Sequence, residues 1–238
     1  MNAPSIPITL LIATRNAHKV GEIRSILGTA FRYLTLNDFP DALTTVEDAA
    51  TFAGNATKKA AELARWLSDT RHSTLDTRHF YVLADDSGLE VDALQGAPGV
   101  YSARFAAMDS GKAGNSSSAE NNTKLLRLLK DVPVEKRTAR FRCVLSLTPV
   151  LAKRTEAASP TCYADELEMQ TENFEGTCEG RIGFEPRGSN GFGYDPLFIP
   201  SGFEQTFAEL GEEVKNRLSH RAKALEKLHV RLNSLLRP

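Results

Sequence analysis

The sequence predicts an α/β fold, in which buried strands alternate with amphipathic helices. Two short apolar runs, residues 8–13 and 80–84, have the length of buried strands, and each ends in a polar stretch. The first run is followed by a helical pattern, because apolar residues recur three and four positions apart between residues 20 and 27. Residues 138–147 alternate apolar and polar side chains, as a half-buried strand does. Strands and helices that alternate in this way favour one sheet with helices packed against it.

The polar residues after the first apolar run form a candidate phosphate site. Residues 14–19 read Thr-Arg-Asn-Ala-His-Lys and precede the helix that we expect to stop at Gly28. A strand, a polar loop and a helix in this order place backbone N–H groups and Lys19 at a helix N-terminus, which favours a phosphate. The segment lacks the glycine spacing of a P-loop, so Asn16 could equally be a helix cap and Lys19 a surface charge.

The next predicted elements are a strand at residues 33–36 and a helix at residues 51–67, whose apolar residues lie on one stripe. Glu47 and Asp48 stand just before this helix. They could favour its positive N-terminus and nothing more, or they could complete a metal site with Asp86.

Two adjacent carboxylates, Asp85 and Asp86, follow the apolar run of residues 80–84 and precede Ser87 and Gly88. We expect the strand to end there, so that both acids lie at its carboxyl end, where α/β sheets bind their ligands. Carboxylate oxygens at such a place suit Mg²⁺ held against a phosphorylated substrate. Asp-Asp-Ser-Gly is also good turn chemistry, and a purely structural turn is the alternative.

The middle of the chain carries turns, a helix and a strand. Residues 96–99 predict a turn, and Ser117 and Glu120 have the spacing of a capping box at the start of a leucine-rich helix. The alternating strand at residues 138–147 is expected to lie antiparallel to a neighbour. Two polar segments are predicted to be exposed, one as a surface loop and one as the extension of a hairpin: residues 68–79 and residues 153–170.

A glycine-rich loop near the C-terminus is a candidate binding site for a flat ring. Residues 188–200 place Phe192 between glycines, with Tyr194 and Asp195 directly after it. The aromatic ring could stack on a base while the acid accepts its N–H groups, although a loop that packs on its own core is the commoner arrangement.

A long amphipathic helix closes the chain, with apolar residues that begin at Leu218 and recur as far as Leu235. His220 and Arg221 lie in its first turn. Side chains at that position can point at an anion or a carbonyl oxygen, so both are candidate ligand contacts.

Composition excludes several classes of protein. The 238 residues suffice for a core without disulfides, and the fractions of 41% hydrophobic and 25% charged residues are ordinary for a globular protein. A net charge of −1 gives no signature of nucleic-acid or membrane binding. Three widely spaced cysteines indicate buried thiols in a reducing compartment. The N-terminal stretch has no basic signal region and no run long enough to span a membrane, so we expect a cytoplasmic protein.

Taken together, these motifs resemble those of the inosine/xanthosine triphosphate pyrophosphatase family, the house-cleaning enzymes that hydrolyse deaminated purine nucleotides. The resemblance is carried, in chain order, by Thr14, Asn16 and Lys19, and by residues 85–88, 96–104, 192–196 and 219–221. It implies a single domain over residues 1–238, with two lobes, a long mixed sheet flanked by helices, and a central substrate cleft. It also implies a homodimer.

The resemblance further implies Mg²⁺-dependent hydrolysis of ITP, dITP and XTP to the nucleoside monophosphate and pyrophosphate, which keeps deaminated purines out of DNA and RNA. Asp86 would be the general base and, with Glu47, a metal ligand, and Ser87 would contact the substrate. The residues implied to contact the triphosphate are Thr14, Arg15, Asn16, Ala17, His18, Lys19 and Lys215. Those implied to contact the base are Phe192, Gly193, Tyr194 and Asp195, and its 6-keto oxygen would be bound by His220 and Arg221.

One departure and two alternatives accompany this interpretation. Arg15 stands where the family usually has a small residue, often glycine, which could tighten the phosphate loop or add a phosphate contact. The chain could instead be a nucleotide pyrophosphatase with a different base preference, or a nucleotide-binding regulatory protein without turnover. Adjacent acids at residues 85 and 86 argue against the pure binder, because two carboxylates that repel each other bring it little.

Overall fold

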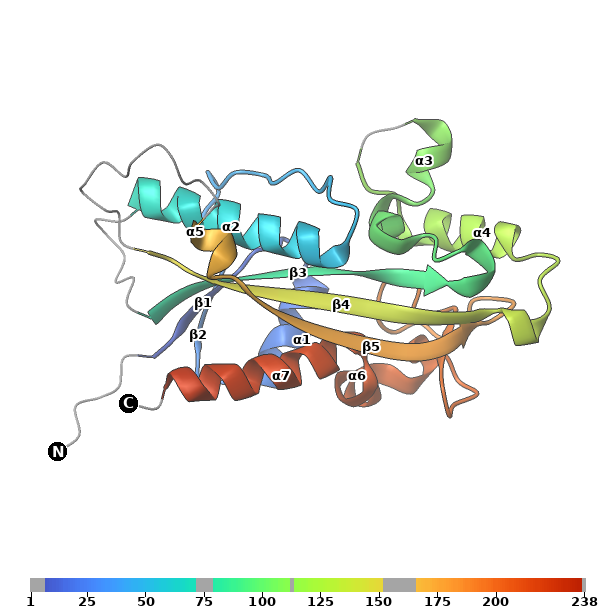
Figure 1. Cartoon of the computed structure of the whole chain (residues 1–238). Helices are drawn as coiled ribbons and strands as arrows, with labels where there is room; N and C mark the ends of the chain where they lie inside the picture. The colour runs from blue at the N-terminus through green and yellow to red at the C-terminus, as the bar shows by residue number, and fades with distance from the viewer. Residues whose placement is uncertain (1–6, 72–78, 112–113, 152–165, 237–238) are drawn as a thin grey trace. The chain divides into compact units, whose positions relative to one another are not determined.

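The computed structural model describes residues 7–71, 79–111, 114–151 and 166–236 of the chain. They form a six-stranded sheet flanked by helices, which confirms the predicted α/β class (Figure 1). Along the sheet the strands lie in the order β2-β1-β3-β4-β5-β6. The strands are β1 (Thr9–Ile12), β2 (Arg32–Thr35), β3 (Phe80–Val91), β4 (Thr138–Pro149), β5 (Glu172–Ile182) and β6 (Phe198–Pro200).

The helices of the described residues range from single turns to α2, which has 20 residues. They are α1 (Ala17–Leu27), α2 (Phe52–Arg71), α3 (Ala107–Ser110), α4 (Ser118–Leu128), α5 (Glu166–Met169), α6 (Phe207–Leu218) and α7 (His220–Leu235). Short 3₁₀ helices occur at η2 (Asp92–Leu94), η3 (Gly99–Arg104) and η4 (Val134–Lys136). A search of the described helices for a bilayer-spanning segment finds none with the necessary length and apolarity.

The sheet is mixed, as the resemblance implies. Strand β1 lies parallel to both β2 and β3, whereas β6 lies antiparallel to β5. The end of β4 meets the start of β3, since the Val150 amide donates to the Phe80 carbonyl over 2.9 Å. The start of β4 meets the end of β5, since the Ile182 amide donates to the Arg137 carbonyl over 2.9 Å. The predicted antiparallel pairing of β4 is therefore confirmed.

The chain divides into two compact units. The first consists of Met1–Asp86, Val144–Phe174 and Leu225–Pro238, and the second of Ser87–Cys143 and Glu175–Ala224. Strands β3, β4 and β5 and helix α7 each belong partly to one unit and partly to the other.

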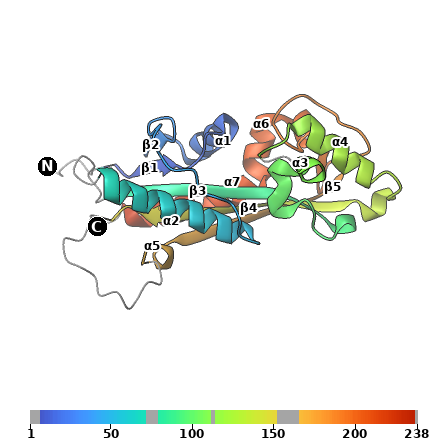
Figure 2. The same ribbon diagram turned by 90° about the horizontal axis from the view of Figure 1, so that it is seen from above.

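In the first unit, α2 lies along β3 (Figure 2) and buries the stripe that the sequence predicts. Its members are all at least nine-tenths buried and are spaced at helical intervals: Phe52, Ala56, Ala60, Leu63 and Leu67. Ala60, Leu63 and Leu67 belong to one apolar cluster with Leu11 of β1 and Val82 of β3. This packing fixes which face of α2 points at the sheet.

In the second unit, α4 begins with the predicted capping box. The Ser117 hydroxyl accepts from the Glu120 amide, and the Glu120 carboxylate accepts from the Ser117 amide. Leu125 and Leu129 are fully buried in a cluster that also contains Phe141 of β4. The capped N-terminus and the leucines together set the position of α4 in this unit.

Two boundary predictions need correction. Helix α2 continues to Arg71, so the predicted loop at residues 68–79 is helical at its start, and residues 72–78 lie outside the described part. Leu218 ends α6 instead of starting α7, because Ser219 adopts an extended backbone between the two helices. Helix α6 itself was not predicted.

The predicted alternation of buried apolar and less buried polar side chains holds only in the first half of β4. From Cys143 to Thr148 both faces of β4 are buried, and Ser146 is 0% exposed. The Ser146 hydroxyl donates to Asn173 of β5, which explains how a polar residue is accommodated there. Of the segment 153–170, residues 153–165 lie outside the described part, and the short helix α5 occupies its end.

Helix α7 begins in direct contact with β5. A Cβ atom on Gly176 would lie 2.0 Å from the carbonyl oxygen of His220 and 2.6 Å from the amide nitrogen of Ala224. No side chain fits at this distance, so glycine at this position lets the first turn of α7 pack against the strand.

We therefore expect Gly176→Ala to lower the free energy of unfolding by about 1–3 kcal/mol, because the new methyl group must displace backbone atoms. Gly183→Ala is the matched control, since its Cβ would meet its nearest neighbour at 3.5 Å, an ordinary contact. Thermal unfolding of both variants checks the expectation. Equal melting temperatures would show that α7 does not need the close approach.

Candidate functional site

The acids Asp85 and Asp86 lie inside β3. The prediction that the strand ends before them in an Asp-Asp-Ser-Gly turn is wrong, because β3 continues to Val91. The parallel neighbour does end here: β1 pairs with β3 from Phe80 to Leu83, and the Ala13 amide donates to the Leu83 carbonyl before the chain turns into α1. The acids therefore follow the carboxyl end of β1, which is where the predicted ligand site of an α/β sheet belongs.

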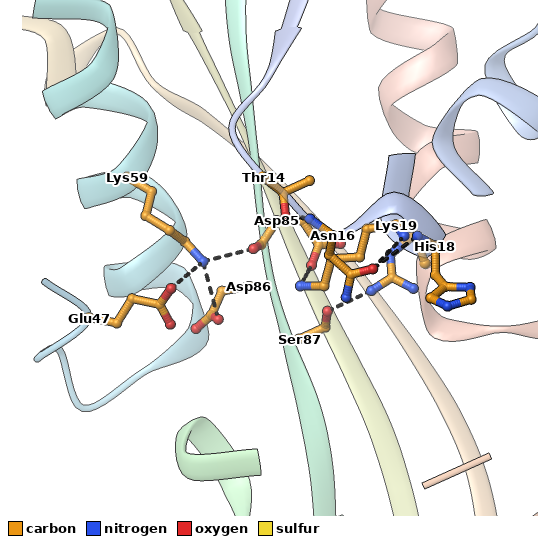
Figure 3. A network of polar contacts seen from close by, with 10 residues as sticks. Thr14, Asn16, His18, Lys19, Glu47, Lys59, Asp85, Asp86 and Ser87 are labelled. Carbon is orange, nitrogen blue, oxygen red and sulfur yellow. Dashed lines mark hydrogen bonds and ion pairs between the residues drawn. The ribbon is translucent and has the colours of Figure 1, made fainter. Parts of the chain in front are cut away.

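The loop between β1 and α1 is ordered by a helix cap. The Asn16 side-chain oxygen accepts from the amides of His18 and Lys19, at 2.9 and 3.3 Å, and Thr14 Oγ1 accepts from the Asn16 amide at 3.1 Å (Figure 3). The helix-cap interpretation of Asn16 is thus confirmed. The side chains around it remain accessible, since Arg15, Ala17 and His18 are all exposed.

Each acid of the pair meets a lysine from a different helix. Lys19 Nζ of α1 forms an ion pair with Asp85. Lys59 Nζ of α2 lies 3.4 Å from Asp86 Oδ1, 3.3 Å from Glu47 Oε1 and 2.8 Å from the Asp85 carbonyl oxygen (Figure 3). Consecutive residues of a strand point to opposite faces, so one acid faces α1 and the other faces α2. Lys19 is therefore more than a solvated surface charge.

Lys59 is a site residue that the sequence analysis missed. A signal for it exists, because Lys59 stands three residues after Ala56 and four before Leu63, which are both members of the buried stripe of α2. A lysine at that spacing lies next to the face that meets the sheet. Its charge then needs a partner in the protein, and Glu47 and Asp86 supply it.

Burial dominates the electrostatics of Asp86. Only 6% of this residue is exposed, and its desolvation raises the pKa of the carboxyl above the ordinary value, although Lys59 and Lys19 act in the opposite direction. The second oxygen, Oδ2, is buried and lies within ordinary hydrogen-bond distance of no donor among the described residues, although the Asn55 amide acts on this carboxyl and lowers its pKa. A buried carboxylate oxygen without a donor is unusual and marks a position where a proton, a cation or a water can bind.

The carboxylates of Glu47 and Asp86 fit a divalent cation. They offer oxygen atoms, they already share the Lys59 ammonium, and Asp86 Oδ2 accepts no bond in the described structure. The described residues contain no group of three or more His, Cys, Asp or Glu side chains that could hold a metal. Mg²⁺ commonly takes one or two carboxylates and completes its shell with water and substrate phosphates, which this pair allows.

A second polar group lies in the second unit, around the loop that carries Phe192. Asp195 Oδ2 accepts from the Phe192 amide at 2.8 Å and from Lys215 Nζ at 2.7 Å. Lys215 Nζ also lies 4.4 Å from the centre of the Phe192 ring, and the Arg221 guanidinium carbon lies 5.9 Å from it. The structure thus groups Lys215 with the residues expected to bind the base, although the resemblance placed it on the triphosphate.

Tyr194 anchors this loop to the core. It is 4% exposed, packs in the same cluster as Phe198, and donates its hydroxyl to the Ser102 carbonyl over 2.8 Å. Burial raises the pKa of the Tyr194 hydroxyl, so it stays protonated as a donor. The ring of Tyr194 therefore supports the loop, while Phe192 is the partly exposed aromatic.

The first turn of α7 contributes two buried cationic or titratable side chains. Arg221 is 1% exposed and donates from Nη2 to Ser87 Oγ over 2.8 Å. His220 is 5% exposed, and its ring stacks on Phe141 with centroids 4.8 Å apart and 13° between the planes. His220 and Arg221 thus lie in the first turn of the helix, as predicted, and the hydrogen bond places Ser87 next to Arg221.

Comparison with known proteins defines the class. The chain matches the Ham1 family over residues 10–230 and belongs to this family. Among its relatives, the dITP/XTP pyrophosphatase of Exiguobacterium sibiricum is 44% identical over 228 residues, covering 95% of this chain and 98% of the relative. The dITP/XTP pyrophosphatase of Geobacter sulfurreducens is 45% identical over 217 residues, covering 91% and 92%.

Solved structures agree with the assignment. A HAM1 protein from Coxiella burnetii has 33% sequence identity and a TM-score of 0.73, covering 95% of this chain and 99% of its own. The Ham1 protein of Staphylococcus aureus has 31% identity and a TM-score of 0.72 over the same shares. The fold is therefore shared over nearly the whole chain.

The raised pKa of Asp86 predicts how stability depends on pH. Because the folded-state pKa lies above the unfolded one, the contribution of Asp86 to stability is fully present at low pH and is lost as the pH rises through the folded-state pKa. An asparagine side chain at this position would be neutral throughout. Asp86→Asn should thus raise the melting temperature at pH 7 to 8, and the gain should shrink towards pH 3.8, the ordinary pKa.

Asp109→Asn is the control with the opposite sign. Lys124 donates a hydrogen bond to Asp109 and holds the pKa of this carboxyl below its ordinary value. The substitution should therefore leave stability unchanged or reduce it at neutral pH. Melting curves of the two variants from pH 4 to 8 test both signs, and a loss of stability for Asp86→Asn at pH 8 would contradict the burial argument.

Proposed function

We propose that this protein hydrolyses non-standard purine nucleoside triphosphates, namely ITP, dITP and XTP, to the nucleoside monophosphate and pyrophosphate. The observation that carries the proposal is the buried carboxyl of Asp86, which has a raised pKa, an oxygen without a donor, and the Lys59 ammonium beside it. The two dITP/XTP pyrophosphatases that are 44% and 45% identical to this chain support the substrate class. By this activity the protein removes deaminated purines before they enter DNA and RNA.

Asp86 acts as the general base. It accepts a proton from the attacking water, the water oxygen bonds to phosphorus, and the bond between the α and β phosphates breaks so that pyrophosphate leaves with the electron pair. A raised pKa moves the carboxylate towards the basicity that this step requires. Ser87 follows Asp86 directly on β3 and contacts the substrate beside it.

Cationic groups stabilise the charge that shifts to the leaving pyrophosphate. The Lys19 ammonium pairs with Asp85 and retains protons to donate to phosphate oxygens. The three N–H groups of the Lys59 ammonium already meet Glu47, the Asp85 carbonyl and Asp86, so a phosphate oxygen would share or replace one of these acceptors. The accessible loop formed by residues 14–19 supplies further contacts with the triphosphate. Glu47 and Asp86 would hold Mg²⁺, which neutralises phosphate charge when it is bound.

Residues of the second unit bind the base. Phe192 offers a ring face for stacking. Asp195 stabilises the loop by accepting from the Phe192 amide, and Lys215 in turn donates to Asp195. His220 and Arg221 donate to the 6-keto oxygen of hypoxanthine or xanthine. Adenine has an amino group at this position, which would leave these buried donors without an acceptor, and such a loss discriminates strongly between substrates.

The proposal includes a homodimer in the cytoplasm. The described cysteines Cys143 and Cys178 are buried thiols with no disulfide between them, which suits a reducing compartment. Light scattering on the purified protein measures the oligomeric state directly.

The deciding experiment incubates the purified protein and Mg²⁺ with ITP, XTP, GTP and ATP, and follows pyrophosphate and orthophosphate separately. We expect pyrophosphate from ITP and XTP and little from GTP or ATP. Asp86→Asn should lower kcat at least about a hundredfold, which is the low end of the effect of a general base. Orthophosphate as the first product would move the cleaved bond, and nucleotide binding without any product would favour a regulatory protein.

Phe192→Ala tests the stacking surface. We expect the KM for ITP to rise about fivefold to a hundredfold, since stacking of a base on an aromatic ring contributes about 1–3 kcal/mol. The melting temperature should change little, because the Phe192 ring is partly exposed. A large loss of stability with an unchanged KM would assign Phe192 to the core instead.

A further inference from the structure

The first turns of α4 hold Gly193 from both sides. Ser118 Oγ accepts from the Gly193 amide at 3.2 Å, and Asn122 Nδ2 donates to the Gly193 carbonyl at 3.1 Å. Ser118 and Asn122 are four residues apart and therefore lie on the same face of the helix. Two side chains of one rigid element thus fix the two peptide groups that flank Gly193.

This glycine is the residue directly after Phe192. Its φ is +64°, a left-handed conformation that glycine adopts readily, and Gly191 before Phe192 has a φ of +77°. Glycine on both sides gives the backbone around Phe192 more freedom than any other pair of residues would. External hydrogen bonds to Gly193 reduce this freedom, in addition to the bond from the Phe192 amide to Asp195.

The side-chain amide of Asn122 uses only part of its hydrogen-bonding capacity. It is 7% exposed, and its Oδ1 is buried with no hydrogen-bond partner among the described residues. A buried amide that uses only its donor is less favourable than one that uses both groups. The neighbouring Asn121 uses both, since Oδ1 accepts from the Ala106 amide and Nδ2 donates to the Ala103 carbonyl. Asn121 is thus an anchor for a different segment, and Asn122 serves the Phe192 loop.

We propose that Ser118 and Asn122 are positioning residues, which set the affinity for the base by holding Gly193 and thereby orienting Phe192. The inference rests on the proposed function, because it takes Phe192 as the surface that binds the base. It adds a helix that contributes none of the residues expected to contact the substrate. Neither Ser118 nor Asn122 belongs to a pattern that pointed to a binding role in the sequence.

The test compares Ser118→Ala and Asn122→Ala with the matched control Asn121→Ala. Loss of one hydrogen bond to Gly193 should raise the KM for ITP about twofold to tenfold, with kcat nearly unchanged, because the reacting phosphates are bound by other residues. Ser118→Thr keeps the hydroxyl and should retain most of the wild-type affinity. Asn121→Ala removes an equally buried amide and should lower the melting temperature without this rise in KM.

A double-mutant cycle separates positioning from general stability. If Ser118 acts through Phe192, then Ser118→Ala should have no further effect on KM once Phe192 is replaced by alanine. Additive effects in this cycle, or the same KM for the variants of Ser118, Asn122 and Asn121, would overturn the inference. If the wild-type protein releases no pyrophosphate from ITP, the proposed function itself is wrong. If the wild-type protein turns ITP over normally but the cycle is additive or the three KM values are equal, only the positioning role is rejected.

Discussion

Two adjacent acids inside a sheet constrain the first unit. Asp85 and Asp86 are 3% and 6% exposed, and an isolated buried carboxylate is strongly disfavoured. Because consecutive strand residues point to opposite faces, each acid needs its own cation. Lys19 from α1 supplies one, and Lys59 from α2 supplies the other. Both helices thus contribute a cation to the same pair of acids, and in the proposed function phosphate oxygens would share the two ammonium groups.

The second unit also contains a buried ion pair, formed by Lys215 and Asp195. Lys215 and Asp195 have side chains that are 4% and 3% exposed, and removing either partner would leave the other charge buried without compensation. The same carboxylate accepts from the Phe192 amide, so the pair also shapes the loop. A Cβ on Gly191 would lie 2.2 Å from Asp195 Oδ2, which is why the loop needs glycine there. The conformation of the Phe192 loop thus depends on charge, on glycine and on the contacts from α4, and so would the proposed affinity for the base.

Local rules predicted the parts of the fold that local interactions determine. The cap at Asn16, the capping box at Ser117 and the buried stripe of α2 are each encoded within a few residues, and each is confirmed. The end of β3 was misplaced because Asp and Gly have low strand propensity, whereas pairing along the sheet overrides that preference. The spacing of Lys59 along α2 indicates that it lies near the sheet, but no short pattern reveals its pairing with Asp86 or the grouping of Lys215 with Asp195, because these contacts join residues far apart in sequence.

The most direct test of the central claim is a crystal structure of Asp86→Asn with ITP and Mg²⁺, since this variant should bind the substrate without turning it over. The account predicts the triphosphate on Lys19 and Lys59, the cation on Glu47, and the base stacked on Phe192 with its 6-keto oxygen near Arg221. A triphosphate bound away from both lysines, or a base that does not contact Phe192, would contradict it.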